Sequence, residues 1–143
     1  MVESAHNIGR DAMLKNLLVL SIFPIILSGC FRPSAEQLAN ADYGQYPSDY
    51  EQTIKSYMAQ RLKDPYSAQF QFLNAPKTAW NGIGGLKYGY AVCALINAKN
   101  SFGGYTGSQL SYFMLRGNTV VDSEHGTDEY STAMARGKCD KLI

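Results

Sequence analysis

Apolar side chains recur every three or four residues between positions 49 and 63, which predicts an amphipathic helix. Its buried stripe should consist of Tyr50, Ile54, Met58 and Leu62. The segment Ser48-Asp49-Tyr50-Glu51 has the pattern of a capping box, in which a serine oxygen accepts from the third backbone amide, and would begin the helix. Asp64-Pro65 would end it, because the residue before a proline avoids the helical region.

Beyond this helix the apolar positions alternate with a period of two, which is typical of β-strands. The segments predicted to be strands are 67–72, 86–98, 108–115 and 119–121. The segment 86–98 is apolar on both of its faces, so we expect a central strand covered on both sides by helices or loops. Gly117-Asn118 predicts a two-residue turn that joins the last two strands into a hairpin.

A second helix is predicted from about Thr127 to between Arg136 and Cys139. Its buried stripe should consist of Tyr130, Ala133 and Met134. Together the elements predict an α+β fold, with one antiparallel sheet of about four strands. The N-terminal and the C-terminal helix are expected to pack on one face of this sheet.

The first thirty residues carry a different pattern. Lys15 precedes an apolar run from Leu17 to Leu27, which has the length of the core of a secretory signal and is too short to span a membrane. The run closes on Leu27-Ser28-Gly29-Cys30, which matches the lipobox of bacterial lipoproteins at all four positions. We therefore predict a signal peptide at residues 1–29 and lipidation of Cys30. The alternative is a buried N-terminal helix with an incidental cysteine.

The resemblance to bacterial lipoproteins has consequences for location. Acidic Glu3 and Asp11 are unusual at the start of a signal peptide, so Met13 is a candidate true start. A triacylated Cys30 would anchor the chain permanently, whereas one acyl chain binds a membrane only marginally. In enterobacterial lipoproteins an aspartate after this cysteine favours the inner membrane. Here Phe31 follows, which implies the periplasmic face of the outer membrane.

The domain organisation follows from this processing site. Residues 30–47 are predicted to be a lipidated tether with a short helical turn at 34–40, and residues 48–143 a single periplasmic domain. The net charge of +1 indicates no nucleic-acid partner. Ten tyrosines and six phenylalanines fit either a tyrosine-rich β domain or a binding face.

Cys93 and Cys139 remain once Cys30 carries lipid. In an oxidising periplasm they would pair, which stabilises the fold by about 4 kcal/mol in the chain-entropy model. The alternative is two free thiols. A cysteine–histidine nucleophile would then need one of them near His125, which lies in a segment that resembles a polar loop. No catalytic residue, metal site or cofactor is predicted, because the potential ligands are too few and too scattered.

The segment from Asn97 to Gly107 is the most specific feature of the chain. Its candidate contact residues are Asn97, Lys99, Asn100, Phe102, Gly103, Gly104, Tyr105 and Gly107. Exposed aromatic rings beside amide and ammonium donors suit the recognition of a glycan, a peptide or a protein loop. The alternative is a structured Ω-loop in which Phe102 and Tyr105 pack against their own domain.

Three segments of the chain resemble a group of small bacterial envelope lipoproteins. They are Leu62-Lys63-Asp64-Pro65-Tyr66-Ser67-Ala68-Gln69-Phe70, Val92-Cys93-Ala94 and Asn97-Ala98-Lys99-Asn100-Ser101-Phe102-Gly103-Gly104-Tyr105-Thr106-Gly107. The resemblance covers roughly Tyr46 to Val121, although such relatives often have glycine where this chain has Ala94. It implies a secreted, lipid-anchored domain and supplies no activity.

The sequence therefore predicts a non-enzymatic binding or assembly module, anchored to the membrane by lipid, with an envelope protein or the cell wall as its partner. One alternative is a periplasmic inhibitor of a lysozyme-like hydrolase, whose cleft a projecting loop would fill. Another is a thiol or hydrolytic enzyme that uses Cys93 or Cys139 with His125.

Overall fold

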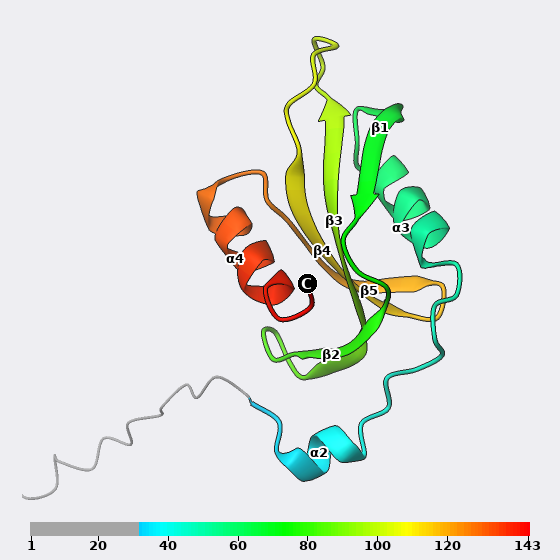
Figure 1. The fold of residues 1–143 in the computed structure, drawn as a ribbon, viewed down its shortest axis with the longest axis vertical. Coiled ribbons are helices and arrows are strands. Elements are labelled where there is room, and N and C mark those ends of the chain that lie inside the picture. The colour runs from blue at the N-terminus through cyan, green and yellow to red at the C-terminus, as the bar shows by residue number, and fades with distance from the viewer. Residues whose placement is uncertain (1–31) are drawn as a thin grey trace, which may run out of the picture. The chain divides into compact units, whose positions relative to one another are not determined.

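The structure is a computed structural model that describes residues 32–143. An antiparallel sheet of five strands has helices packed against it, which confirms the α+β class (Figure 1). The elements are α2 (Ala35–Ala39), α3 (Tyr50–Ala59), β1 (Asp64–Phe72), β2 (Lys77–Asn81), β3 (Lys87–Lys99), β4 (Gln109–Arg116), β5 (Thr119–His125) and α4 (Glu129–Cys139). The predicted signal peptide, the start at Met13 and the lipidated Cys30 lie outside the described residues.

The long strand β3 is the centre of the sheet. The order is β1-β3-β4-β5, and β2 pairs with β3 as well. β1 pairs with the second half of β3, up to Asp64 opposite Lys99, and β2 pairs with the first half, from Asn81 opposite Lys87. β2 was not predicted, because its five residues show no clear alternation of apolar and polar side chains. The predicted turn at Gly117-Asn118 joins β4 to β5.

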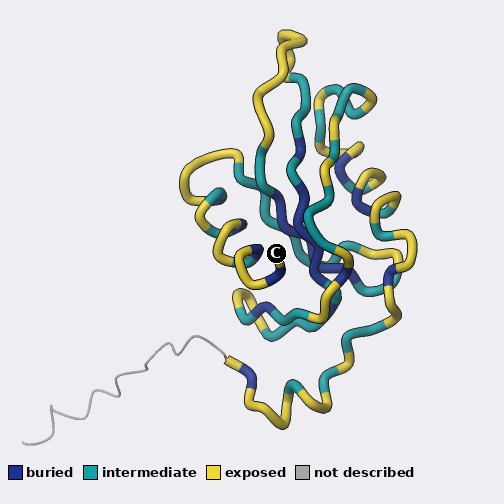
Figure 2. The backbone as a smooth tube through the Cα atoms, viewed as in Figure 1, coloured by how far each residue is buried: buried dark blue, intermediate teal, exposed yellow. Residues whose placement is uncertain are grey.

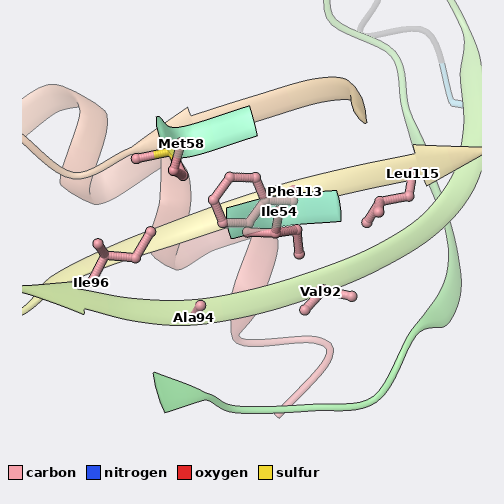
Figure 3. Close-up of a cluster of buried hydrophobic side chains, with 7 residues drawn as sticks. All are labelled: Ile54, Met58, Val92, Ala94, Ile96, Phe113 and Leu115. Atoms are coloured by element: carbon pink, nitrogen blue, oxygen red, sulfur yellow. The ribbon is translucent and has the colours of Figure 1, made fainter. Parts of the chain in front are cut away.

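Each face of the sheet is covered by a different helix. On one face α3 packs on a cluster formed by Ile54, Met58, Val92, Ala94, Ile96, Phe113 and Leu115 (Figure 3). On the other face lies the end of α4. Its residue Cys139, with Leu142 just beyond the helix, packs with Ala91, Cys93, Tyr112 and Met114. The expectation that both helices share one face is therefore wrong. Successive residues of β3 point to opposite faces, and since both sets are apolar, each needs its own cover.

The helix α3 is shorter than predicted and begins differently. Asp49 is its N-cap residue and makes no side-chain capping bond, so the capping box predicted at Ser48 is not formed. The helix begins one residue too late for Ser48 and Glu51 to have the required spacing. The predicted stripe is confirmed for Ile54 and Met58, which are buried.

The helix α4 is rotated relative to the prediction. Its buried residues are Ser131, Ala135 and Cys139, whereas Tyr130 is 75% exposed. Ala133 is exposed as well, so the stripe predicted from Tyr130, Ala133 and Met134 is wrong. Cys139 is bonded to the sheet, and residues spaced four apart lie on one side of a helix. The covalent link therefore accounts for the face that is buried.

The segment 42–47, which the sequence assigns to the tether, contacts the sheet. The Tyr43 ring meets the Tyr88 ring at 5.8 Å, and the amide of Gly117 donates to the carbonyl of Gln45 at 2.8 Å. The chain therefore enters the domain where β3 begins and β4 ends. The predicted helical turn at 34–40 is confirmed as α2. None of the helices in the described part of the chain is both long and apolar enough to cross a bilayer.

Candidate binding surface at the β3–β4 loop

The loop between β3 and β4 extends beyond the neighbouring strands (Figure 1, yellow). Residues 100–108 are all exposed (Figure 2). The loop follows the end of β3, so it lies at the opposite end of this strand from the segment 42–47. It therefore projects away from the place where the chain enters the domain.

Hydrogen bonds to Asn100 fix the turn of this loop. Its side-chain oxygen accepts from the amides of Phe102 at 2.9 Å and Gly104 at 3.1 Å. The backbone amide of Asn100 donates to the backbone carbonyl of Gly104 at 2.8 Å. Gly103, between them, has φ +80°, a conformation that a residue with a side chain rarely adopts. The backbone of the loop is thus ordered before any partner arrives.

Asn97 and Thr106 hold the base of the loop. The side-chain oxygen of Asn97 accepts from the amide of Gly107 at 3.1 Å, and the amide and hydroxyl of Thr106 both donate to the carbonyl of Ala98. The two asparagines predicted as contact residues therefore bond to the loop itself. Their role in this structure is to shape the surface that other side chains present.

Phe102 and Tyr105 differ in how they meet the domain. The Phe102 side chain is 96% exposed, whereas Tyr105 is 47% exposed and its hydroxyl donates to the carbonyl of Ser67 in β1 at 3.1 Å. The Ω-loop alternative therefore describes Tyr105 in part and does not describe Phe102. Tyr66, the neighbour of Ser67, is fully exposed.

Two lysines accompany these rings. The ammonium nitrogen of Lys99 lies 5.4 Å from the centre of the Tyr105 ring, and Lys99 pairs with Asp64, the residue after exposed Lys63. We call the set Lys63, Tyr66, Lys99, Phe102 and Tyr105 the tip surface. Sequence reasoning missed Lys63 and Tyr66 as members, because nothing local to them indicates that β1 lies beside the loop. One signal could have pointed to them. The Lys63-Asp64-Pro65-Tyr66-Ser67 segment is one of the segments that carry the resemblance to envelope lipoproteins, together with the loop itself.

Cys93 and Cys139 form a disulfide, as predicted, with their Cα atoms 5.9 Å apart. Both side chains are completely buried. Neither sulfur is therefore a free nucleophile in this structure. Among residues 32–143, no group of three or more histidine, cysteine, aspartate or glutamate side chains is arranged to hold a metal ion.

His125 lies at the end of β5, opposite Ser111, and not in a polar loop as predicted. Pairing with β4 continues through this residue, which extends the strand beyond position 121. The imidazole packs 5.3 Å from the Phe113 ring and 6.4 Å from the Tyr57 ring, and both of its nitrogens are buried without a hydrogen-bond partner. Burial, and then the nearby Arg61 cation, lower the pKa of His125. It is thus a neutral packing residue.

Asp122 in β5 contacts side chains from three other elements, β2, β3 and α4. Its carboxylate accepts from the side-chain amide of Asn81 at 2.6 Å and lies 3.3 Å from the Lys138 ammonium group and 3.8 Å from that of Lys87. Lys138 also lies 3.8 Å from Glu124. These contacts connect β2, β3 and α4 to β5. The acidic residues that the sequence placed in a loop therefore have structural partners.

Comparisons of the chain with protein-family models, with curated proteins and with solved structures find no match. The resemblance to small envelope lipoproteins stays a prediction. Any statement about function therefore depends on the tip surface and on the pattern around Cys30.

Proposed function

We propose that the protein is a non-enzymatic, lipid-anchored binding or assembly module of the bacterial envelope, and that the tip surface contacts its partner. The observation that carries the proposal is the 96% exposure of Phe102 on a loop held by its own hydrogen bonds. Removing such a ring from water contributes about 1.5–3 kcal/mol. Because the loop is already ordered, little of this gain is lost to the entropy of fixing it.

The direction of the loop suits a lipid anchor at Cys30. The chain enters the domain at the start of β3, and the tip surface follows the end of this strand, which has 13 residues. At about 3.3 Å per residue the two places are roughly 40 Å apart. An anchored domain of this kind leaves its tip surface free for a partner in the periplasm.

The alternative of a thiol enzyme finds no support in the arrangement of its three candidate residues. Cys93 and Cys139 are bonded to each other and completely buried. His125 packs among aromatic rings, with both nitrogens buried. A nucleophilic cysteine needs a thiolate that substrate can reach, together with a base that can accept its proton.

The first arm of the test concerns the anchor. Mass spectrometry of the protein purified from membranes should find fatty-acylated Cys30 as the first residue. Cys30→Ser should release the protein into the soluble fraction. An unmodified and uncleaved chain recovered from the cytosol would contradict the anchoring.

The second arm concerns the contact surface. A photo-reactive amino acid at position 102 should give a defined crosslink in living cells, and Lys99→Ala and Tyr105→Ala should weaken it. The matched control is the same photo-reactive group at Ile83, which is 60% exposed in a glycine-rich turn between β2 and β3. A crosslink that is equally strong from position 83, or that neither variant changes, would move the contact away from the loop.

A further inference from the structure

We infer that the free edge of β5 binds an extended segment of another protein, which adds to the sheet as a further strand beside the groove between α3 and β5. The inference goes beyond the proposed function, because it concerns a second surface and does not depend on the tip surface or on the lipid anchor. It is carried by the backbone of this edge, by the groove next to it and by the side chains of β5 itself.

β5 is an edge strand whose outer side is open. It pairs with β4, and among residues 32–143 no other strand pairs with it. Thr119 is exposed and the rest of the strand is only half-buried. The edge of a sheet offers a row of backbone donors and acceptors to a further strand. The natural complement of such an edge is therefore another polypeptide in extended form.

The register of β4 and β5 indicates which backbone groups are free. The amide of Gly126 donates to the carbonyl of Leu110 at 2.9 Å, so these two residues form a hydrogen-bonded pair. In an antiparallel ladder bonded and non-bonded pairs alternate, which makes Glu124 a bonded residue. Ser123, opposite Phe113, is then a non-bonded one. The amide and the carbonyl of Ser123 therefore point to the open edge.

A groove of about 490 Å³ adjoins the start of this edge. One wall is formed by α3, and the other by the turn before β5 and the first residues of the strand, including Val120. By the same alternation the backbone groups of Val120, opposite Leu115, point to the open edge. Every second side chain of a strand added there would face the α3 side of the sheet. Those side chains would meet the groove.

The lining of the groove indicates the chemistry of these side chains. It consists mainly of hydroxyl and amide groups, and Asp49 is the charged residue among those that line it. Gln52, Ser56 and Gln60 are spaced four apart and form one side of α3. Hydroxyl and amide groups both donate and accept hydrogen bonds. We therefore expect a segment with uncharged polar side chains, such as serine, threonine, asparagine or glutamine, at alternate positions.

A second copy of this chain does not fit the groove, because the side chains of β5 on the α3 face are already engaged. The Ser123 hydroxyl lies 2.8 Å from the Tyr57 hydroxyl, and the His125 ring lies 6.4 Å from the Tyr57 ring. If two β5 strands paired, each would have to present these same side chains to the groove of the other. Its own α3 covers them. The occupant is therefore a segment of a different protein.

The opposite edge of the sheet is less suited to this role. β1 contains Pro65, which has no amide, and its register with β3 is interrupted between Asp64 and Gln69. β5 has one interruption, at Val121, which has no partner in the register with β4. A bulge of this kind twists an edge strand and discourages pairing with a long, flat strand. The edge of β5 therefore selects a short segment.

Phage display of random peptides of about ten residues, the length of a long strand, supplies the probe. Peptides selected on the purified protein in detergent are synthesised, and amide exchange is measured by NMR with and without them. We expect exchange at Val120 and Ser123 to slow by about tenfold or more, because the added strand bonds to their amides. The amide of Glu124, which already belongs to the ladder with β4, should not change.

Ser123→Pro and Ser123→Ala form a matched pair of variants. Proline removes the outward amide and takes no bond from the ladder with β4. It should weaken peptide binding on the order of tenfold, as expected when a hydrogen bond is lost and a carbonyl is left without its donor. Ser123→Ala loses the same contact to Tyr57 and keeps the amide, so it should weaken binding far less. Thermal melts show whether both variants fold.

Four results would overturn this inference. They are a selection that yields no binding peptide, peptides that bind without slowing exchange at Ser123, equal weakening by Ser123→Ala and Ser123→Pro, and dimers of the protein alone that protect the Ser123 amide. If Ser123→Pro does not fold, the exchange measurement on the wild-type protein decides. None of these results bears on the proposed function, which the crosslink from position 102 tests separately.

Discussion

Phe102 and Phe113 belong to consecutive segments of the chain and have opposite environments. Phe113 is completely buried beneath α3, and truncating such a ring typically costs about 3–5 kcal/mol of stability. Phe102 is 96% exposed and packs on nothing in its own domain. Variants of Phe102 therefore report on binding without disturbing the fold. The same separation holds for Tyr66, which is exposed, and Tyr112, which is buried.

His125 makes the stability of the domain sensitive to pH. Its pKa is lowered from the ordinary value of 6.5 by burial first and by the Arg61 cation second. In the folded protein the imidazole therefore stays neutral at a pH where the unfolded chain already binds a proton. Since the unfolded state binds more protons in that range, stability falls as the pH decreases.

Urea unfolding at about pH 7.5 and about pH 5 measures this effect. We expect full stability above the unfolded pKa of 6.5 and a progressive loss as the pH falls from there through the folded pKa. His125→Phe, which keeps a flat ring beside Phe113, should remove most of the pH dependence in this range. A wild-type curve that is flat between the two pH values would contradict the assignment of His125 as a buried neutral group.

At the scale of the elements, β3 and β4 approach each other at Gly89 so closely that a side chain there would not fit. A methyl group at Gly89 would lie 2.7 Å from the carbonyl oxygen of Leu115 and 2.8 Å from Cγ of Met114. Gly89 is therefore needed for the close approach of β3 to β4 at this point. Gly137, in α4, has open space where its methyl group would be. Here glycine only weakens the helix, because it has more backbone freedom to lose on folding.

These two glycines give a matched pair of variants. Gly89→Ala should destabilise the protein by about 1–3 kcal/mol, because the added carbon has to displace backbone. Gly137→Ala should stabilise it by about 0.5–1 kcal/mol, because alanine is the better helix former. The midpoints of chemical unfolding measure both changes. Equal midpoints for the two variants would show that the approach at Gly89 is looser than the structure indicates.

The whole domain consists of a sheet with one helix on each face, and the two helices are attached differently. α3 is held by the apolar packing of its own residues Ile54 and Met58 against the sheet. α4 carries a disulfide to Cys93 and ion pairs from Lys138 to Asp122 and Glu124. Its buried residues are small, so packing alone holds it weakly. The covalent link therefore matters more for α4 than any single contact.

Replacement of both Cys93 and Cys139 by alanine tests this attachment. The cysteines are 46 residues apart in the sequence, and a link of that length stabilises by about 4 kcal/mol in the chain-entropy model. Domains of this size have only about 5–15 kcal/mol in total. We expect a large drop in the melting temperature and rapid tryptic cleavage after Arg136. Reduced wild-type protein should behave in the same way. Unaltered protection of α4 in both samples would contradict the predicted role.

Periodicity along the chain was sufficient to predict several parts of the fold. The double-sided apolar pattern of β3 indicated a central strand, and the spacing of Ile54 and Met58 indicated the buried side of α3. The pairing of Cys93 with Cys139 followed from counting cysteines. These features depend on residues near one another in the sequence, or on covalent chemistry with few alternatives. They are therefore accessible before the fold is known.

Other features depend on residues that are distant in the sequence. The choice of opposite faces for α3 and α4 follows from the need to cover both sides of β3, and the rotation of α4 follows from its disulfide. His125 is buried because β5 continues along β4. Local polarity suggested a loop there, since Asp122 and Glu124 give no sign of the lysine and asparagine that meet them.

The candidate surface shows the same division. From the amino-acid order alone came the glycine-rich loop, its two aromatic residues, its lysine and the pattern that predicts an anchor at Cys30. Folding turned Asn97 and Asn100 inward as hydrogen-bond acceptors, left Phe102 in solvent and added Tyr66 from β1. Composition can nominate side chains for binding. Whether a given side chain faces a partner depends on which neighbours use its polar atoms or cover its ring, and those neighbours are assembled by the sheet.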